Sequence, residues 1–462
     1  MYLLVSTSKK PLYQQLYQQI RDKILSGELN AHTKLPSCRY LATELHVSRN
    51  TVDTAYQQLL SEGYIVGKSR SGYYVEVIPN TKYSIFTEVT PDTTTNELKL
   101  DRVLYNFQYG NLSQQSFPFV QWQQLTNFCL KQYKEQFLNY GDLIGESGLR
   151  RELTKYLHEY RDVRCTPDQI LITSGTIQCL SLICQLIKNK IDTVAMEDPG
   201  FSAAYTAFTN HGFQVSLVPV NYHGLNVKAL RNTTANAVYV TPSHQFPTGR
   251  TMSIARRLQL IDWAYERNAL IIEDDYNCHL RYDVKPAPAL QGLAPDKVIY
   301  IGSFSKILSP SLRIAYMVLP QNLALSLQQK SENFSCSVPF IIQKPLELFL
   351  QENLFEGHLR KIRRQFKKKR DILLHALQKH FGETITVSGE NAGIHILLDV
   401  NQPISSAILI DKARKAGIYL SSNNIWVESS PSKMGRVLLG YGGIKDEDID
   451  PAISLLRQIW LN

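Results

Sequence analysis

The sequence has no apolar run long enough to cross a membrane, and its first residues lack the charged and apolar regions of a signal peptide. Its seven cysteines are odd in number and show no paired spacing, which argues against a disulfide framework. Cys179 and Cys184 fall inside an apolar stretch and are expected in a core. The sequence therefore predicts a soluble, cytoplasmic protein with reduced thiols and no membrane partner.

Length and charge narrow the class further. A chain of 462 residues is too long for one hydrophobic core, so two or three domains are expected. Hydrophobic residues make up 44% of the chain, which suffices for large interiors. The net charge of +9 and a pI near 9.0 suit a polyanionic partner or a phosphorylated ligand, although mild basicity can also serve solubility alone.

Residues 1–78 carry the pattern of three short helices and a hairpin. Apolar residues recur every fourth position from Leu12 to Ile24, which predicts a helix with one buried face. A second helix is expected to open at Ser37, and a third at its cap, Ser48. Two short strands within residues 64–77 complete a predicted winged helix-turn-helix.

The third helix leaves polar side chains on its first turn, where a recognition helix meets base edges, and the hairpin adds basic residues that could hold phosphates. The candidate DNA contacts are Arg39, Ser48, Arg49, Asn50, Thr51, Lys68 and Arg70. Winged helices also serve as protein-protein modules, which remains the alternative. The stretches 35–56 and 62–65 resemble the GntR family of bacterial DNA-binding domains, and this resemblance implies that residues 1–78 bind DNA.

Residues 79–104 show no sustained period and include the polar run from Pro91 to Asn96. Such a composition buries too little apolar surface to fold alone. We interpret it as a linker, long enough to let the DNA-binding domain sit far from the rest of its own chain.

Strands and helices are expected to alternate from residue 105 to residue 462. Five short apolar runs without polar alternation predict strands that are buried on both faces of a largely parallel sheet. These runs are residues 169–173, 193–196, 237–240, 270–272 and 298–301. The pattern predicts an α/β fold with its ligand site at the carboxyl ends of the strands.

Residues suited to a cofactor follow these runs. Ser174, Gly175 and Thr176 offer amides and hydroxyls at a helix start, where a phosphate binds well. Phe201 could lie flat on an aromatic ring. Asp274 could pair with a protonated ring nitrogen. A metal site is disfavoured because no His or Cys stands at ligand spacing near Asp274.

The fifth run leads to a stretch from Ser303 to Arg313 that surrounds Lys306 with hydroxyls. A lysine that forms a Schiff base with an aldehyde cofactor needs neighbours that desolvate its amine. Ser303, Ser305 and Arg313 could hold the phosphate of such a cofactor. Taken singly, each feature is common, and a solvated loop lysine, a helix cap or a solvated aspartate pair remain alternatives.

In this order the five strand ends resemble the fold-type I aminotransferases, which bind pyridoxal 5'-phosphate (PLP), over residues 105–462. With the GntR-like domain, the whole chain resembles a MocR/GabR-type transcription regulator, which implies PLP as cofactor and a homodimer. The resemblance implies that Lys306 holds PLP as a Schiff base, Asp274 pairs with the ring nitrogen, Tyr276 bonds the 3'-oxygen and Phe201 stacks on the ring. It assigns the phosphate to Ser174, Gly175, Thr176, Ser303, Ser305, Arg313 and the partner subunit's Tyr140, and a ligand carboxylate to Arg436.

Two positions depart from the related enzymes and sensors. Phe246 stands where aminotransferases usually carry the asparagine of Asn-Pro-Thr-Gly, which argues against efficient full transamination. Ala203 stands where sensors of γ-amino acids are expected to keep an arginine, which disfavours 4-aminobutyrate as the signal. PLP itself or a smaller amino compound is favoured, with vitamin B6 synthesis genes as the first guess for targets.

Residues 358–370 form a basic stretch with an apolar stripe at Leu359, Ile362 and Phe366. The stripe predicts a helix that leaves eight basic residues outside it. Either this surface is a solvated helix face, or it makes a second contact with the DNA backbone.

The sequence thus predicts a PLP-dependent regulator that binds paired half-sites of double-stranded DNA as a homodimer and responds to PLP or an amino compound. A competent aminotransferase with an accessory DNA-binding domain is the main alternative. A ligand-binding repressor with an inactive cofactor pocket is the other.

Overall fold

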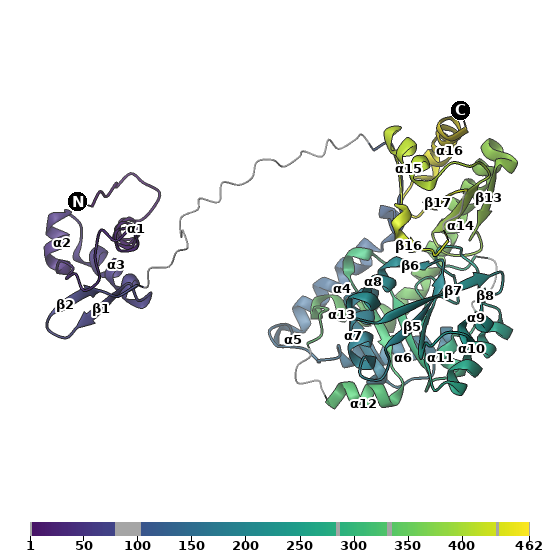
Figure 1. Ribbon diagram of the computed structural model, residues 1–462, viewed down its shortest axis with the longest axis horizontal. Coiled ribbons are helices and arrows are strands. Elements are labelled where there is room, and N and C mark those ends of the chain that lie inside the picture. The colour runs from purple at the N-terminus through teal and green to yellow at the C-terminus, as the bar shows by residue number, and fades with distance from the viewer. Residues whose placement is uncertain (1, 79–102, 283–286, 330–334, 431–433, 462) are drawn as a thin grey trace. The chain divides into compact units, whose positions relative to one another are not determined.

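The computed structural model describes residues 2–78, 103–282, 287–329, 335–430 and 434–461 (Figure 1). The chain divides into two compact units, Met1–Leu98 and Lys99–Asn462. Most of the predicted linker, residues 79–102, lies outside the described residues. Among the helices that the structure describes, none combines the length and apolar character required to cross a membrane.

The first unit is a winged helix-turn-helix, as the sequence predicts. Its elements are α1 (Leu12–Leu25), α2 (Cys38–Glu44), α3 (Arg49–Ser61) and the antiparallel pair β1 (Ile65–Lys68) and β2 (Gly72–Val75). The side chains of Ser37 and Ser48 accept hydrogen bonds from backbone amides in the first turns of α2 and α3, which fixes where both helices begin. The apolar faces of all three helices meet in one core around Leu16, Val52 and Tyr56.

The second unit is built on an eight-stranded sheet that is mostly parallel. In spatial order its strands are β4 (Ile170–Thr173), β12 (Ala315–Val318), β11 (Val298–Ser303), β10 (Leu270–Asp274), β9 (Ala237–Val240), β5 (Thr193–Asp198), β7 (Gln214–Asn221) and β8 (Gly224–Leu225). The five predicted strands are present. β12, antiparallel to both of its neighbours, was not predicted, and β5, β10 and β11 each run two residues further than expected.

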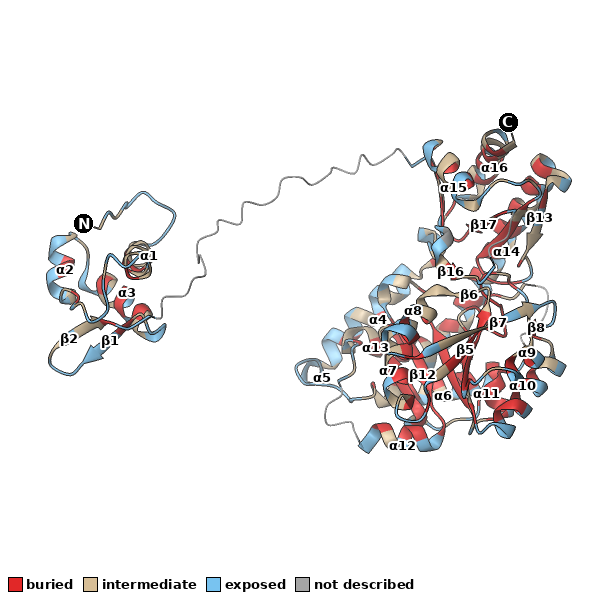
Figure 2. Cartoon of the chain, viewed as in Figure 1, coloured by how far each residue is buried: buried red, intermediate tan, exposed pale blue. Residues whose placement is uncertain are grey.

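Helices cover both faces of this sheet, and its strands from β4 to β5 are buried almost throughout, whereas β7 is mostly half-buried or exposed (Figure 2). One face packs against α7 (Thr176–Ile187), α8 (Ser202–Asn210) and α12 (Gln321–Gln329). The other packs against α6 (Ser147–Arg161), α9 (Val227–Arg231), α10 (Ile254–Glu266), α11 (Leu290–Leu293) and α13 (Phe340–Gln351), with α4 (Phe119–Gln132) and α5 (Lys134–Phe137) beyond. Cys179 and Cys184 are buried in α7, as predicted, and all seven cysteines are free.

A smaller layer follows the long helix α14 (Leu354–Phe381). Its antiparallel sheet contains β13 (Ile385–Ser388), β14 (His395–Val400) and β17 (Gly435–Gly440), covered by α15 (Ser406–Lys415) and α16 (Asp446–Leu461). Two short pairings tie this layer to earlier parts of the unit. β15 (Ile418–Leu420) pairs with β3 (Tyr105–Phe107), and β16 (Trp426–Val427) pairs with β6 (Gly200–Phe201). The start of the unit and the Phe201 segment are thereby held against the small layer.

Candidate functional site

The predicted DNA contacts gather on the first turn of α3, on α2 and on the wing. Arg39, Arg49 and Asn50 are exposed, as are Lys68 and Arg70 at the tip of the hairpin. Ser48 and Thr51 bond to each other. The Ser48 hydroxyl accepts a hydrogen bond from the backbone amide of Thr51 at 3.1 Å and lies 2.8 Å from the Thr51 hydroxyl. Those two side chains therefore hold the start of the helix in shape, while the exposed ones are available to a ligand.

The cofactor candidates of the second unit come from neighbouring strands whose carboxyl ends share one edge of the large sheet. Ser303 lies opposite Ala315 of β12, which in turn lies opposite Thr173 of β4. Asp274, the last residue of β10, lies opposite Ile301 of β11. The register therefore brings the segments that follow β4, β10 and β11 together, although about a hundred residues separate β4 from β10 in the chain.

Lys306 presents a desolvated amine at this edge. Its Nζ lies 3.9 Å from the centroid of the Tyr109 ring, and burial lowers the pKa of the amine to about 8. Gly110 is close as well, since a Cβ at that position would stand 2.9 Å from Nζ. Tyr109 and Gly110 follow β3 and were missed by the sequence reasoning, because no strand was predicted before them.

Asp274 is a buried carboxylate without a cation. Its Oδ2 accepts a hydrogen bond from the Tyr239 hydroxyl at 2.7 Å, and its Oδ1 has no partner. Burial raises the pKa of Asp274 to about 7, against the opposing effect of the Tyr239 hydrogen bond. A protonated ring nitrogen is the kind of group that such a carboxylate would hold, so Asp274 fits the cofactor that the fold implies.

The phosphate candidates form a cradle at the start of α7. Gly175 is the helix cap with φ of +132°, and a Cβ there would stand 2.5 Å from Nη2 of Arg313, so only glycine allows this close approach. The Ser303 hydroxyl donates to Ser305 at 3.1 Å. The amide of Ser174 donates to the Gln178 side chain at 2.6 Å. A guanidinium, hydroxyls and a helix start thus converge where a phosphate would fit.

Aromatic rings line the same region. The centroids of Phe201 and Phe246 are 5.5 Å apart, and those of Phe246 and Tyr276 are 6.3 Å apart. The Tyr276 hydroxyl donates to the carbonyl of His244 at 2.9 Å. Phe246 is buried, so the position at which aminotransferases carry an asparagine places an apolar ring beside Phe201 and Tyr276.

Two predicted residues are not free to bind a ligand in the manner expected. The side chain of Tyr140 is fully exposed in this single chain and contacts none of the cofactor candidates. Arg436 is half-buried and paired with Asp399 and Glu428, each at 2.8 Å. A ligand carboxylate would have to displace these two carboxylates from the guanidinium.

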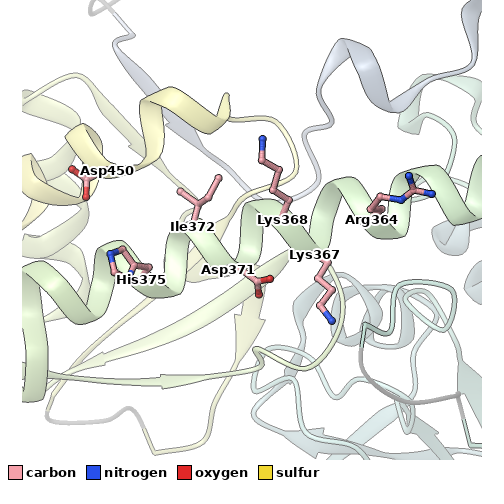
Figure 3. A pocket seen from close by; sticks show the side chains of 7 residues that line it. All are labelled: Arg364, Lys367, Lys368, Asp371, Ile372, His375 and Asp450. Carbon is pink, nitrogen blue, oxygen red and sulfur yellow. The ribbon is translucent and has the colours of Figure 1, made fainter.

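The basic stretch 358–370 lies within α14, and part of its prediction is wrong. Lys369 and Arg370 are buried rather than solvated, because Lys369 bonds the Ile444 carbonyl and Arg370 stacks on the Tyr282 ring, with its guanidinium carbon 4.9 Å from the centroid. Other basic residues of the helix line two open hollows of about 520 and 1280 Å³; the first holds Arg364, Lys367 and Lys368 together with Asp371 and Asp450 (Figure 3).

Comparison with known proteins covers both units. Residues 12–75 match the model of the gntR family of bacterial regulatory proteins, and residues 106–456 match that of aminotransferase class I and II. The chain is 37% identical to the HTH-type transcriptional regulator YdeL of Bacillus subtilis, over 97% of each chain. It is 30% identical to the probable rhizopine catabolism regulatory protein MocR of Rhizobium meliloti, over all of this chain and 96% of MocR.

Solved structures agree on the second unit. A kynurenine aminotransferase of Pyrococcus horikoshii superposes with a TM-score of 0.71 at 26% identity, over 78% of this chain and 90% of that one. The two relatives that match along nearly the whole chain are transcriptional regulators. The kynurenine aminotransferase, in contrast, has no counterpart for about a fifth of this chain. The chain therefore belongs to the MocR-type transcriptional regulators, in which a GntR helix-turn-helix domain is joined to an aminotransferase class I and II domain.

Proposed function

We propose that this regulator binds PLP at Lys306 and that PLP, alone or with an amino compound, sets how strongly the GntR domain holds its operator. One observation carries the proposal. The buried Lys306 amine, the cation-free Asp274 carboxylate and the cradle of Gly175 and Arg313 all lie at the same edge of the large sheet. When bound, PLP supplies an aldehyde that condenses with amines and a ring that withdraws electrons.

Lys306 is prepared to act as a nucleophile by its surroundings. With a pKa of about 8, about one amine in ten is neutral at pH 7, against about three in ten thousand at the ordinary value. The Tyr109 ring covers the amine and keeps water from it. Asp274 is positioned to hold a cationic ring nitrogen, and Arg313, Ser303 and Ser305 to hold a phosphate.

The DNA-binding half of the proposal rests on the exposed side chains of the first unit. Arg49 and Asn50 stand on the first turn of α3, from which a recognition helix reads base edges. Arg39, Lys68 and Arg70 flank it and would bind phosphates. A homodimer would present two such units to paired half-sites.

Exposed apolar side chains around Tyr140 favour that homodimer. They occur along α4, on α5 and in the following loop, and exposed apolar surface that gathers in one place marks protein–protein contact sites. The exposed residues are Phe119, Val120, Phe128, Leu130, Phe137, Leu138, Tyr140 and Leu143. A second copy packed on this surface would cover it, and could carry Tyr140 toward the partner's phosphate cradle.

The rival function, a working aminotransferase, is disfavoured by Phe246. A buried phenyl ring cannot donate the hydrogen bond that an asparagine gives to the ring oxygen. We expect a purified sample to convert at most about one equivalent of amino donor per site. Repeated turnover with a keto acid acceptor would favour the enzyme.

The proposal is tested by adding PLP to the full-length protein and to Lys306→Ala. We expect wild type to gain a visible absorbance band, and to change its affinity for a duplex selected from random DNA. Lys306→Ala should show neither effect. The matched control is Lys297→Ala, because Lys297 also lies over a tyrosine ring, at 5.5 Å from the Tyr265 centroid, but it precedes β11 whereas Lys306 follows that strand. Identical behaviour of wild type and Lys306→Ala on DNA, with and without PLP, would contradict the proposal.

A further inference from the structure

Three buried polar side chains next to the cofactor candidates lack hydrogen bonds of good geometry. We call His244, Asn277 and His395 the imidazole cluster. Their exposed fractions are 1%, 2% and 0%. None of the histidine ring nitrogens and neither polar atom of the Asn277 amide makes a hydrogen bond of good geometry. The carbonyl of Pro247 still faces His395, and the Tyr276 hydroxyl faces Asn277. Leaving such groups poorly bonded costs stability, so an arrangement with several of them in one place, His244 above all, suits a further hydrogen-bonding group.

The cluster adjoins Lys306 through one aromatic ring. The centroids of His244 and His395 are 4.9 Å apart, and that of His395 is 5.0 Å from the Tyr109 ring, over which the Lys306 amine lies. His395 is the first residue of β14, and Leu397 of the same strand packs in one buried apolar cluster with Phe246. The cluster therefore stands beside the position of the reactive amine and not on a remote part of the fold.

Both histidines are neutral. Burial, and then the charge of Arg281, lowers the pKa of His244 to about 3. Burial, His244 and Lys306 hold the pKa of His395 well below its ordinary value, although the carbonyl of Pro247 opposes them. A neutral imidazole offers one N–H donor and one nitrogen acceptor, and a carboxamide offers both kinds of group as well.

The same unit satisfies its other buried histidines. Nδ1 of His279 lies 2.5 Å from the Tyr156 hydroxyl oxygen, within hydrogen-bond distance. Burial lowers the pKa of His279 to about 3 as well. His358 bonds the carbonyl of Ile307 at 2.5 Å. The backbone of Gly393 packs closely against the cluster, because a Cβ at that position would come within 2.7 Å of the Asn277 amide nitrogen and 2.9 Å of Nε2 of His244.

A metal ion does not account for the cluster. Within the described ranges, no three His, Cys, Asp or Glu side chains gather as a metal site would require. A negatively charged group is a poorer match, since neither imidazole carries a positive charge and the guanidinium of Arg281, whose charge acts on His244, stands outside the cluster. An uncharged group that both donates and accepts hydrogen bonds matches the cluster best.

We propose that His244, Asn277 and His395 form a subsite that binds an uncharged hydroxyl or carboxamide group of the amino compound that reaches Lys306. The inference rests on the proposed function and narrows it, because it names the chemical class of the effector. It selects hydroxylated or amidated amino compounds over purely aliphatic ones, and over those with a second carboxylate.

Binding of four amino acids to the PLP-loaded protein tests the subsite. L-Serine and L-alanine differ by one hydroxyl, and L-asparagine and L-aspartate have nearly the same shape but differ in charge. We expect L-serine and L-asparagine to bind about tenfold more tightly than their counterparts, by calorimetry and by change in the visible band. Equal affinities within both pairs, or no detectable binding of any of the four, would overturn the proposal.

Apolar variants supply a readout that does not depend on the loaded protein. His395→Phe and His244→Phe keep a ring in the aromatic contacts and remove the unpaired nitrogens. Without PLP, we expect both variants to melt at or above the wild-type temperature. With PLP, they should lose the preference for L-serine and L-asparagine while binding PLP as before. His395→Gln, which keeps a donor and an acceptor, should retain that preference even if a phenylalanine variant does not fold.

The remaining outcomes separate other roles of the cluster. His279→Phe is the matched control, which should change the melting temperature without changing the preference among the four amino acids. Lower stability of the two phenylalanine variants with an unchanged preference would show that buried water serves the nitrogens. Weaker binding of PLP itself would show that the cluster holds the cofactor. Either result overturns the subsite, whereas a wild-type protein with no visible band would instead refute PLP binding as such.

Discussion

Asp274 and Asp275 are neighbours in the chain and equally buried, yet they belong to two regions with opposite electrostatics. Asp275 accepts hydrogen bonds from Nε of Arg161 and from the Tyr300 hydroxyl, both at 2.7 Å. Asp274 has only the hydroxyl of Tyr239. Each carboxylate leaves one oxygen without a hydrogen bond, so the difference between them is the cation.

The pKa values of the two carboxyls diverge accordingly. Burial pushes both upward, but Arg161, Ser243 and Tyr300 outweigh it at Asp275 and hold its pKa below the usual range. At Asp274 burial prevails and the pKa rises to about 7. The region around Asp275 is therefore complete without a ligand, whereas the region around Asp274 lacks a cation. Such a contrast is typical of structural and ligand-binding polar groups.

The largest effect on stability is expected from Arg161→Met. The change removes the cation from Asp275 and leaves a buried carboxylate with no opposite charge, which should lower the free energy of unfolding by about 3–5 kcal/mol. Denaturant unfolding of the full chain without PLP measures it. Asp274→Asn is the matched control and should leave that free energy unchanged or higher. If Arg161→Met were as stable as wild type, the distinction between the two regions would fail.

Asp274→Asn should act on PLP instead. The amide keeps the shape and the bond to Tyr239 but removes the negative charge, so we expect PLP to bind about ten- to hundredfold more weakly. Titration of the visible band measures the affinity. Unfolding of the same variant without PLP tells whether the loss is local. Unchanged PLP affinity would remove Asp274 from the cofactor site.

The pH dependence of stability should carry opposite signs for the two carboxyls. Because the folded pKa of Asp274 lies above its unfolded value of 3.8, its contribution falls as the pH rises from about 4 to about 7, by at most about 4 kcal/mol. Asp275, whose folded pKa is depressed, stabilises the fold above its unfolded value and loses that effect as the pH falls.

Unfolding free energies over this range, without PLP, check the sign. In Asp274→Asn, the fall of the unfolding free energy with rising pH should become shallower but should not disappear. Burial also raises the pKa values of Glu197 and Glu273 to about 7, so these two groups titrate in the same range. A variant with the wild-type slope would show that Asp274 does not titrate in this window.

The smallest effect is expected on α14, where the distinction between engaged and available charges recurs. Lys369 and Arg370 are buried with partners, whereas Arg360, Lys361 and Arg364 are exposed. Replacing these three by glutamate should weaken DNA binding modestly. The slope of the logarithm of the binding constant against the logarithm of the salt concentration should become shallower by about one for each lost phosphate contact. Anisotropy at several salt concentrations measures both. Unchanged values would identify a solvated face.

Local sequence signals predicted much of the fold. The fourfold spacing from Leu12 to Ile24, the caps Ser37 and Ser48 and the apolar run 237–240 each depend on residues close in the chain, and the helices and strand lie where they were expected. β12 escaped prediction because its antiparallel place between β4 and β11 depends on pairing with distant strands. Burial of Lys369 was missed for the same reason, since its partners lie on α16 and just before it.

The sequence by itself determined the two kinds of unit, the place of Lys306 after a buried strand and the helix start at Gly175, because such features are encoded in short runs of residues. Only the tertiary structure decided that Tyr109 covers Lys306, that Arg161 and not a ligand neutralises Asp275, and that His244 and His395 meet. Those relations join segments far apart in the chain, and burial and charge compensation depend on what surrounds a side chain, which spacing along the sequence does not encode.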